Sequence, residues 1–376
     1  MRVLIAGGGT GGHLFPGIAL AEELVTRHHK NDVVFVGTER GLEARVVPAA
    51  GYKLETIKVQ GLKGVGLWRV VKSLWVLPAA FVASWNLLRR YRPDVVVGVG
   101  GYSSGPVVLA AWCQRLPTAV QEQNALPGLT NRILGRLVRA VFVAFDEARR
   151  FFPAGKVHLV GNPIRRAMME NYLRARQKRE LFTVLVFGGS LGAAGLNARV
   201  VEALDSLADV KAQMRFVHQT GAKEVDSVRK AYADKGFNAE VVEFIDDMAT
   251  AYAGADLVVC RAGATTLAEL TVCRKASLLV PFPHATDNHQ EVNARALVDA
   301  GAALMFREAE LTGPMLAAQL RALKDDPQRL LKMEKAAGFL GRPEASKELA
   351  DVCVQMMVDT WGPKGRDRPD KKSSPR

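Results

Sequence analysis

The sequence predicts an α/β protein with two doubly wound parallel-sheet domains. Short β-branched or leucine-rich runs alternate with helical stretches such as residues 16–27 and 194–207. Runs that are apolar on both faces are typical of buried parallel strands. A strand-like run also enters a glycine-rich loop twice, at residues 7–13 and at 188–193. Each such opening begins a doubly wound domain, and a length of 376 residues also favours two domains.

The expected strands indicate how the chain is divided into domains. They lie at residues 3–6, 33–36, 95–97, 184–187, 257–259 and 278–280. We place the first domain at residues 1–162 and the second at 163–340, with the boundary near the Gly161-Asn162-Pro163 segment. Residues 361–376 are rich in Lys, Arg, Pro and Ser and are expected to be disordered. Ligands are expected in a deep cleft between the domains, at the carboxyl ends of both sheets.

The composition is that of a soluble globular protein, with 48% hydrophobic and 24% charged residues. Four cysteines lie far apart without a CxxC pair, which favours reduced thiols and argues against a structural zinc site. The apolar run after Met1-Arg2 is too short for a signal peptide, and no stretch reaches the ~20 apolar residues of a spanning helix. We therefore expect a cytosolic protein.

The formal charge of +13 is unevenly distributed. Residues 1–160 hold 20 Lys and Arg against 10 Asp and Glu, and no acidic residue lies between Glu55 and Asp94. A basic balance can indicate nucleic acid, an anionic membrane or a phosphorylated ligand. No nucleic-acid-binding module is recognisable, so we expect no nucleic-acid partner.

Glycine loops at helix starts bind anions, because backbone N–H groups and the helix dipole point at the ligand. The spacing Gly7-x-Gly9-x-x-Gly12 formally matches the dinucleotide fingerprint, with Glu39 as a possible ribose ligand. A tight turn without a ligand is the alternative. A third loop at residues 98–106 follows another expected strand. Several loops fit two phosphorylated ligands better than one dinucleotide.

Residues 244–269 hold a second candidate site. An expected strand ends in Cys260-Arg261-Ala262-Gly263, and a helix should start near Thr265 or Thr266. Thr266 and Glu269 have the spacing of a capping box, so Glu269 could cap its own helix. It could equally accept hydrogen bonds from ribose hydroxyls while a diphosphate lies at the helix start. The local sequence leaves both interpretations open.

Ordered sequence blocks then point to one family. They are GGGTGGHLFPG, GLKGVG, GVGGYSSGP, QEQNALPGLTNR, GNPIR, FGGSLGA, the 244–269 segment and PFPHATDNHQEVNA. Together they span roughly residues 3 to 294, and in content and order they resemble the MurG family of bacterial glycosyltransferases. The resemblance implies the GT-B fold, with a final helix at about 341–358 returning to the first domain. It also implies an inverting reaction without metal or other cofactor, and no Asp-x-Asp motif occurs in these blocks.

The resemblance further implies a reaction and a donor site. The 4-hydroxyl of a lipid-diphosphate-linked muramyl-pentapeptide attacks UDP-N-acetylglucosamine (UDP-GlcNAc), and UDP leaves. Ile245 would present its backbone to uracil, Glu269 would hold the ribose, and Arg165 would contact the diphosphate. The expected donor-binding residues are Thr10, Gly11, Gly12, Asn124, Arg165, Ser190, Ile245, Ala264, Thr265, Thr266, Leu267, Glu269 and Gln290. His289 is the alternative to Gln290, because this segment varies in length among relatives.

The reaction needs a base for the acceptor's hydroxyl proton. His13 closes the first glycine loop and is the first candidate, since imidazole titrates near neutral pH. A histidine that only hydrogen-bonds the loop is the alternative. Glu122 is the competing base. The family usually has His at the position of Gln121, and this departure argues against an essential acid or base there.

A helix-like face between residues 67 and 85 predicts a membrane contact. Leu67, Leu74, Trp75, Phe81 and Trp85 lie on it, flanked by cations such as Arg89 and Arg90. Apolar and tryptophan side chains rimmed by cations fit anionic lipid headgroups. Packing on the domain's own sheet is the alternative, and Pro78 should break or kink the run.

The acceptor's diphosphate is expected near Gly100, Gly101, Tyr102 and Ser103. We expect a peripheral protein at the cytoplasmic face of the inner membrane, with other cell-wall synthesis proteins as possible partners. The nearest rival is another GT-B UDP-sugar transferase acting on a lipid or small aglycone. A nicotinamide-dependent oxidoreductase and a nucleic-acid-binding protein are more distant alternatives.

Overall fold

A computed structural model describes residues 1–39, 41–58, 67–166, 168, 180–189 and 192–365, with the side chains of residues 67–77 and of Thr286 left out. The described part forms two compact units. The first contains residues 1–123, 127–163 and 344–365; the second contains residues 124–126, 164–166, 168, 180–189 and 192–343. Residues 366–376 of the expected basic tail lie outside the described residues.

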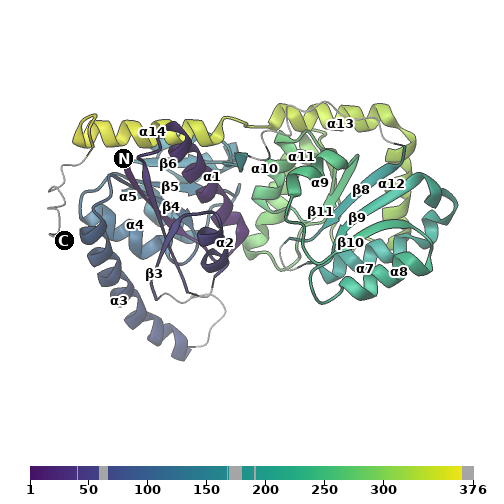
Figure 1. Cartoon of the computed structure of the whole chain (residues 1–376), viewed down its shortest axis with the longest axis horizontal. Helices are drawn as coiled ribbons and strands as arrows, with labels where there is room; N and C mark the ends of the chain where they lie inside the picture. Colours follow the sequence, from purple (N-terminus) through teal and green to yellow (C-terminus); the bar gives the residue numbers. More distant parts are fainter. Residues whose placement is uncertain (40, 59–66, 167, 169–179, 190–191, 366–376) are drawn as a thin grey trace, which may run out of the picture. The chain divides into compact units, whose positions relative to one another are not determined.

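The described part of the first unit holds a parallel sheet in the order β3-β2-β1-β4-β5-β6-β7 (Figure 1). Its strands are β1 (Arg2–Gly7), β2 (Asp32–Gly37), β3 (Lys53–Thr56), β4 (Val95–Gly100), β5 (Thr118–Glu122), β6 (Ala140–Val143) and β7 (Val157–Leu159). Its helices are α1 (Gly11–Arg27), α2 (Glu43–Ala49), α3 (Leu67–Tyr91), α4 (Ser104–Cys113), α5 (Leu129–Leu137) and α14 (Ala345–Trp361), with short 3-10 turns at Asp146–Phe151 and Ala154–Lys156.

The second unit repeats this plan with strand order β10-β9-β8-β11-β12-β13 among its described residues. Its strands are β8 (Phe182–Phe187), β9 (Met214–Gln219), β10 (Asn238–Val242), β11 (Leu257–Cys260), β12 (Ser277–Leu279) and β13 (Ala303–Met305). Its helices are α7 (Ala194–Ala203), α8 (Val225–Asp234), α9 (Met248–Gly254), α10 (Ala264–Val272), α11 (His289–Asp299), α12 (Gly313–Asp325) and α13 (Pro327–Leu340), with 3-10 turns at Asp205–Gln213 and Thr286–Asn288. The predicted doubly wound parallel fold is confirmed.

The same kind of hydrogen bond, from a backbone N–H to an aspartate, occurs at the start of the first strand in both sheets. Asp94, just before β4, accepts a hydrogen bond from the backbone N–H of Arg2 at 2.6 Å. Asp256, just before β11, accepts one from the N–H of Thr183 at 2.9 Å. Each aspartate therefore joins the amino ends of the two strands between which the strand order reverses. Ligands of such folds bind at the opposite, carboxyl ends of these strands.

Alternate residues of the first sheet bury its two faces separately. Val3 and Ile5 belong to a core with α1 and α14, whereas Leu4 and Ala6 belong to a core with α3, α4 and α5. This follows from the two-residue period of a strand. The C-terminal helix α14 lies beside α1 (Figure 1), where Arg27 pairs with Asp351 and donates to the carbonyl oxygen of Lys347 at 2.9 Å.

Candidate functional site

The first glycine loop joins β1 to α1 and is held by a buried carboxylate. Glu43, which is 1% exposed, accepts hydrogen bonds from the N–H of Gly9 at 2.8 Å and from the hydroxyl of Thr38 at 2.7 Å. A Cβ atom at Gly8, Gly37 or Gly41 would collide with the side chain of Glu43. Burial raises the pKa of Glu43, but the hydrogen bonds outweigh it and leave the pKa lowered.

The first and third glycine loops meet at the carboxyl end of the sheet. Gly7 of β1 pairs with Gly100 of β4, with a register shift before it. Gly100 and Gly101 have φ values of 94° and 81°, which favour glycine. A side chain at Gly101 would also collide with the backbone of Gly8. Both loops therefore need glycine for close backbone approach.

His13 lies where these loops meet β5. Its Nδ1 atom is 3.1 Å from Oε1 of Gln123, and Nε2 of Gln123 donates to the carbonyl oxygen of Val99 at 2.8 Å. A Cβ atom at Gly100 would lie only 2.6 Å from Nδ1 of His13. The imidazole is thus held by a hydrogen bond on one side and packed against Gly100.

Glu122, the competing base, is 2% exposed and holds the turn after β5. Its Oε2 atom accepts hydrogen bonds from the N–H of Gly128 at 3.2 Å and from Nδ2 of Asn131 at 3.0 Å. Gln121 is fully buried and donates to the carbonyl oxygen of Gly161 at 3.3 Å. The environment of Glu122 favours a structural role, so His13 is the better candidate base.

In the second unit, Glu269 of α10 is buried beside Tyr252 of α9. The tyrosine hydroxyl donates to Oε2 of Glu269 at 3.0 Å. Burial raises the pKa of Glu269 to about 7, although the positive charge of Arg165 and the hydrogen bond from Tyr252 act in the opposite direction. Burial also raises the pKa of Tyr252 well above its ordinary value. A buried carboxyl group that titrates near neutral pH is typical of a functional site.

The capping interpretation of Glu269 is wrong. Helix α10 begins at Ala264 with Gly263 as its N-cap, earlier than predicted. Thr266 is therefore inside the first turn and Glu269 lies in the second, too far along to cap the helix start. Gly263 has no side chain to satisfy the first amides of the helix, and such a terminus suits an anionic group.

The segment around Ile245 is tied to the second glycine loop through Gln219 at the end of β9. Gln219 accepts a hydrogen bond from the N–H of Ile245 at 3.1 Å and donates to the carbonyl oxygen of Gly189 at 2.7 Å. Ser190 itself lies outside the described residues. Asp247 accepts a hydrogen bond from the N–H of Thr250 at 3.0 Å and caps α9. One of the two adjacent aspartates, Asp246 and Asp247, therefore has a structural role.

Two further residues predicted to bind the donor, Asn124 and Gln290, make hydrogen bonds that involve α11. Asn124 accepts a hydrogen bond from Nδ2 of Asn293 at 3.1 Å, and the fully buried Asn293 also accepts from the N–H of Ala125 at 2.9 Å. Oε1 of Gln290 accepts from the N–H of Phe282 at 2.9 Å. Five further residues of the site could not be predicted from local sequence patterns, because each contacts a partner elsewhere in the chain: Gln123, Gln219, Asn293, Tyr252 and Glu43.

The remaining predicted ligands lie at the two helix starts and the third loop. Thr10 is exposed and Gly11 and Gly12 are partly exposed, whereas Ala264, Thr265 and Leu267 are buried and Thr266 is partly exposed. In the third loop, Gly100 and Ser103 are buried, Gly101 is partly exposed and Tyr102 is 56% exposed. The first unit thus brings His13 together with Gly100 and Gly8 together with Gly101, and the second brings Arg165 near Glu269.

The expected membrane face belongs to α3, which continues through Pro78, so the proline does not end the helix. Phe81 and Trp85 are half-buried, pack against the core of their own unit, and have ring centroids 6.0 Å apart. The side chains of Leu67, Leu74 and Trp75 lie outside the described residues. Val82 on α3 and Trp112 on the neighbouring α4 are 56% and 43% exposed; Trp112 was not expected.

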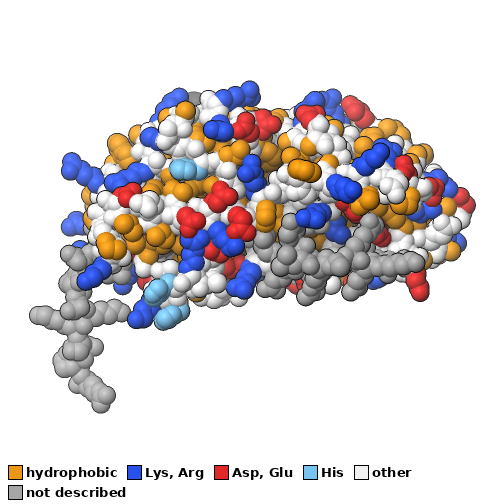
Figure 2. Space-filling model, turned by 90° about the horizontal axis from the view of Figure 1, so that it is seen from above, with side chains coloured by type: hydrophobic (Ala, Val, Ile, Leu, Met, Phe, Trp, Pro, Cys, Tyr) orange, Lys and Arg blue, Asp and Glu red, His pale blue; other side chains and the backbone are white. Residues whose placement is uncertain are grey.

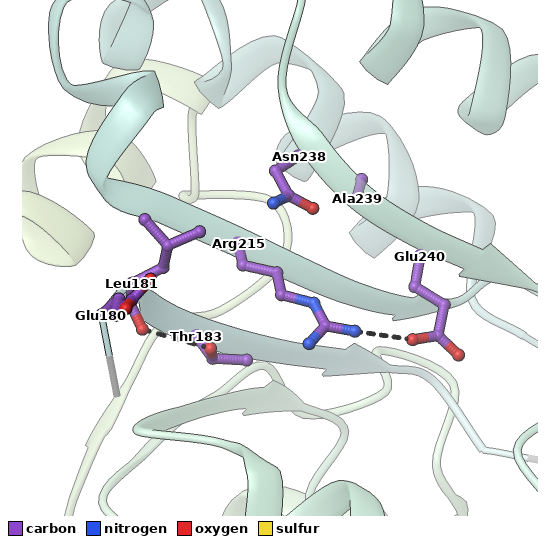
Figure 3. A pocket seen from close by; sticks show the side chains of 7 residues that line it. All are labelled: Glu180, Leu181, Thr183, Arg215, Asn238, Ala239 and Glu240. Atoms are coloured by element: carbon purple, nitrogen blue, oxygen red, sulfur yellow. Dashed lines mark hydrogen bonds and ion pairs between the residues drawn. The ribbon is translucent and has the colours of Figure 1, made fainter. Parts of the chain in front are cut away.

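One open pocket lies away from these residues (Figure 3). It is lined by Glu180, Leu181, Thr183, Arg215, Asn238, Ala239 and Glu240. These residues lie at the amino-terminal ends of β8, β9 and β10, and Arg215 pairs with Glu240 at 2.9 Å. Ligands of doubly wound sheets bind at the opposite, carboxyl ends. The pocket is therefore not the candidate site.

Two absences hold for the described residues only. They contain no helix that is long and apolar enough to cross a membrane. They also contain no group of three or more His, Cys, Asp or Glu side chains placed to hold a metal ion.

Comparison with known proteins identifies the family. Residues 3–143 match the model of the glycosyltransferase family 28 N-terminal domain, and residues 183–352 match that of the C-terminal domain. A UDP-N-acetylglucosamine–N-acetylmuramyl-(pentapeptide) pyrophosphoryl-undecaprenol N-acetylglucosamine transferase of Myxococcus xanthus is 72% identical over 98% of this chain and 96% of its own length. The chain belongs to the MurG family of glycosyltransferases.

More distant MurG relatives agree with this membership. The transferase of the same name from Geobacter sulfurreducens is 47% identical over 94% of this chain and 98% of its own. The crystal structure of Acinetobacter baumannii MurG has a TM-score of 0.75, with 31% identity over 94% of this chain and 99% of that one. The fold is therefore GT-B, and family membership decides against the dinucleotide interpretation of residues 7–12.

The fold alone would not have decided the activity. A UDP-GlcNAc 2-epimerase from Neisseria meningitidis, solved with UDP-GlcNAc bound, has a TM-score of 0.68 at only 15% identity, over 94% of this chain and all of that one. An epimerase and a transferase thus share this architecture, which shows the fold and not the reaction.

Proposed function

We propose that this protein transfers GlcNAc from UDP-GlcNAc to the 4-hydroxyl of a lipid-diphosphate-linked N-acetylmuramyl-pentapeptide. The observation that carries the proposal is the 72% identity, over 98% of the chain, to a relative whose name states this transfer. The arrangement of residues fits the reaction: a histidine lies beside two glycine loops in one unit, and a buried carboxylate lies near an arginine in the other.

The donor is proposed to bind the second unit. The start of α10 after Gly263 would receive the diphosphate, with Arg165 as a charged donor. Glu269 would accept hydrogen bonds from the ribose hydroxyls, and Ile245 would present its backbone to uracil. The Gln219 bridge between Ile245 and Gly189 supports this role, because it fixes the uracil segment relative to the second glycine loop.

The proposed chemical step assigns a role to each of these residues. The acceptor's 4-hydroxyl oxygen attacks the anomeric carbon while its proton passes to His13. The bond between the anomeric carbon and the UDP oxygen breaks, and UDP leaves with the electron pair. The helix start and Arg165 stabilise the charge that develops on the diphosphate. Attack from the face opposite UDP inverts the anomeric centre, and the proposal includes no metal ion.

The transfer is tested by product formation from radiolabelled UDP-GlcNAc and a lipid-diphosphate-linked muramyl pentapeptide, in detergent with EDTA. We expect a disaccharide product at the same rate with and without EDTA. A parallel reaction with diacylglycerol or a small aglycone as acceptor tests the rival transferase activities. Transfer only to those acceptors, or no transfer with bound UDP-GlcNAc, would overturn the acceptor assignment.

The protein is further proposed to work as a peripheral protein on an anionic membrane, at the cytoplasmic face of the inner membrane. Exposed Val82 and Trp112, with exposed Arg89 about two helical turns after Val82 on α3, support a contact surface on the first unit. Arg90 is partly neutralised by Glu55, at 2.8 Å.

On the face drawn in Figure 2, Lys and Arg side chains are interspersed with acidic and hydrophobic ones. Such a mixed surface does not resemble the basic stripe of a nucleic-acid-binding protein.

Flotation with vesicles tests the membrane contact. We expect Val82→Asp to reduce binding to vesicles containing anionic lipid, because a charge would replace an exposed apolar side chain. Equal binding of the unchanged protein to neutral and anionic vesicles would contradict the electrostatic part. Other cell-wall synthesis proteins remain proposed partners, testable by co-purification from a membrane fraction.

A further inference from the structure

Gln123 is a buried amide directly after β5 whose two ends have different partners. It is 1% exposed. Its Nε2 atom lies 2.8 Å from the carbonyl oxygen of Val99, and its Oε1 atom lies 3.1 Å from Nδ1 of His13. The amide therefore bridges the end of β4 and the histidine of the first glycine loop, across 110 residues of sequence.

The partner at Val99 fixes the orientation of this amide. A backbone carbonyl can only accept a hydrogen bond, so the NH₂ end of Gln123 must face it. The reversed amide would place two acceptor oxygens against each other in a buried site, which is costly. The end facing His13 is consequently the oxygen, which can only accept.

The orientation of Gln123 then decides the protonation of the imidazole. Because Oε1 accepts, Nδ1 of His13 must carry a hydrogen and donate it. In the neutral ring the other nitrogen, Nε2, then has no hydrogen and a free electron pair. Gly100 supports this position, since its missing side chain leaves room for the ring close to Nδ1.

We propose that Gln123 is a positioning residue that sets the tautomer of His13, so that Nε2 is the nitrogen that takes the acceptor's proton. The inference rests on the proposed function of His13 as the base. During transfer the proton moves from the acceptor oxygen to Nε2, and the Nδ1 hydrogen bond to Gln123 is kept in both states. The bridge therefore needs no rearrangement during the reaction.

The tautomer is measured directly by nitrogen NMR of the full chain labelled with ¹⁵N-histidine, at a pH where His13 is neutral. The His13 signals are assigned by their loss in His13→Gln. We expect a protonated Nδ1 and an unprotonated Nε2. A protonated Nε2 in the unchanged protein would overturn the proposal whether or not the protein is an active transferase.

Kinetics of Gln123 variants give the second readout. Gln123→Met keeps the size of the side chain but loses both hydrogen bonds. We expect kcat to fall about 10- to 100-fold, less than the roughly 10²–10⁴ that a general base contributes, because His13 itself is still present. The KM for UDP-GlcNAc should stay within about twofold, and the NMR signals should show a mixture of tautomers. An unchanged kcat with an unchanged tautomer would also overturn the proposal.

Gln123→Glu separates orientation from packing. One carboxylate oxygen would still accept from Nδ1, but the other would face the carbonyl oxygen of Val99 without a hydrogen to donate. We therefore expect a kcat between those of Gln123→Met and the unchanged protein. The carboxylate would also stabilise the imidazolium, and the acidic limb of the rate profile should move to higher pH. A rate profile that keeps its position in this variant would contradict the contact between the two side chains.

A matched control is Gln114→Met. Gln114 also donates to a backbone carbonyl, that of Trp85 at 3.1 Å, in the same unit. This variant should leave kcat unchanged. If the tautomer is as proposed but no variant or unchanged protein transfers GlcNAc, the proposed function fails while the role of Gln123 in setting the tautomer stands.

Discussion

The hydroxyl of Tyr252 donates a hydrogen bond to Oε2 of Glu269 at 3.0 Å, and both side chains are buried. The carboxyl group proposed to hold the donor's ribose is thus oriented by a residue of the preceding helix. Burial raises its pKa to about 7, above the usual value of 4.5. Protonation of Glu269 therefore competes with its proposed role near neutral pH.

The affinity for UDP-GlcNAc should consequently depend on pH. Ribose hydroxyls donate to the ionised carboxylate, so a protonated Glu269 must lose its proton on binding. With a pKa of about 7, about 9% of the carboxyl groups are ionised at pH 6 and about 91% at pH 8. We therefore expect the affinity to be about tenfold weaker at pH 6 than at pH 8. Titration calorimetry measures this, and the diphosphate diester of the donor adds no ionisation of its own.

Glu269→Gln is the control for this pH dependence. It should bind more weakly at pH 8 and show a flat profile between pH 6 and 8. The same ionisation affects folding: a raised folded-state pKa contributes stability below about 4.5 that is lost as the pH rises through about 7. A pH-independent affinity in the unchanged protein would argue against Glu269 as a ribose ligand.

Replacement of Glu43 should loosen the first glycine loop. In Glu43→Gln one acceptor oxygen is lost, so the N–H of Gly9 or the Thr38 donors lose a buried partner. We expect a loss of about 1–3 kcal/mol in the unfolding free energy, together with reduced turnover. Binding of UDP-GlcNAc to the second unit should persist.

Glu147→Gln, an exposed carboxylate of the same unit, is the comparison for Glu43. It should leave both the thermal midpoint and turnover unchanged. An equal midpoint for the two variants would show that the Gly9 contact does not hold the loop.

The buried ion pair of the second unit should contribute more to stability than an exposed one nearby. Arg261, with a side chain 8% exposed, pairs with Glu308 and also donates to the carbonyl oxygens of Val280 and Pro281. Glu308→Gln leaves the buried guanidinium without its counter-charge, and we expect a cost of about 3 kcal/mol. Chemical denaturation measures it.

The exposed pair of Arg307 and Glu310, 3.6 Å apart, supplies the control. Glu310→Gln should leave the transition where it is, because exposed pairs are screened by water. A denaturation midpoint that is the same for Glu308→Gln and the unchanged protein would contradict the assigned role of the buried pair.

Local patterns predicted the fold well. Buried runs such as residues 3–6 and 184–187 became β1 and β8, and the glycines after them became the turns into α1 and α7. Both signals lie within a few neighbouring residues, where strand burial and turn geometry are decided. The start of α10 was predicted too late, near Thr265 or Thr266, because the capping-box spacing was a stronger signal than Gly263. The helix begins at Ala264, with Gly263 as its N-cap.

Relations between distant residues could not be read from the sequence. The buried surroundings of Glu122 arise from Gly128 and Asn131, and the support of His13 arises from a glutamine 110 positions away. Likewise, an apolar helix face that contains Phe81 and Trp85 is expected both for a membrane contact and for packing within the domain. Only the structure shows that both side chains pack against the core of their own unit. Such relations depend on strand order, which a single local pattern does not contain.

His13→Ala tests most directly whether the first unit removes the acceptor's proton while the second binds the donor. Turnover and the dissociation constant for UDP-GlcNAc would be measured on the same preparation, with His29→Ala, an exposed histidine of the same unit, as control. We predict that kcat falls by roughly 10²–10⁴ while the dissociation constant stays within about twofold. Retained turnover in His13→Ala would contradict the account.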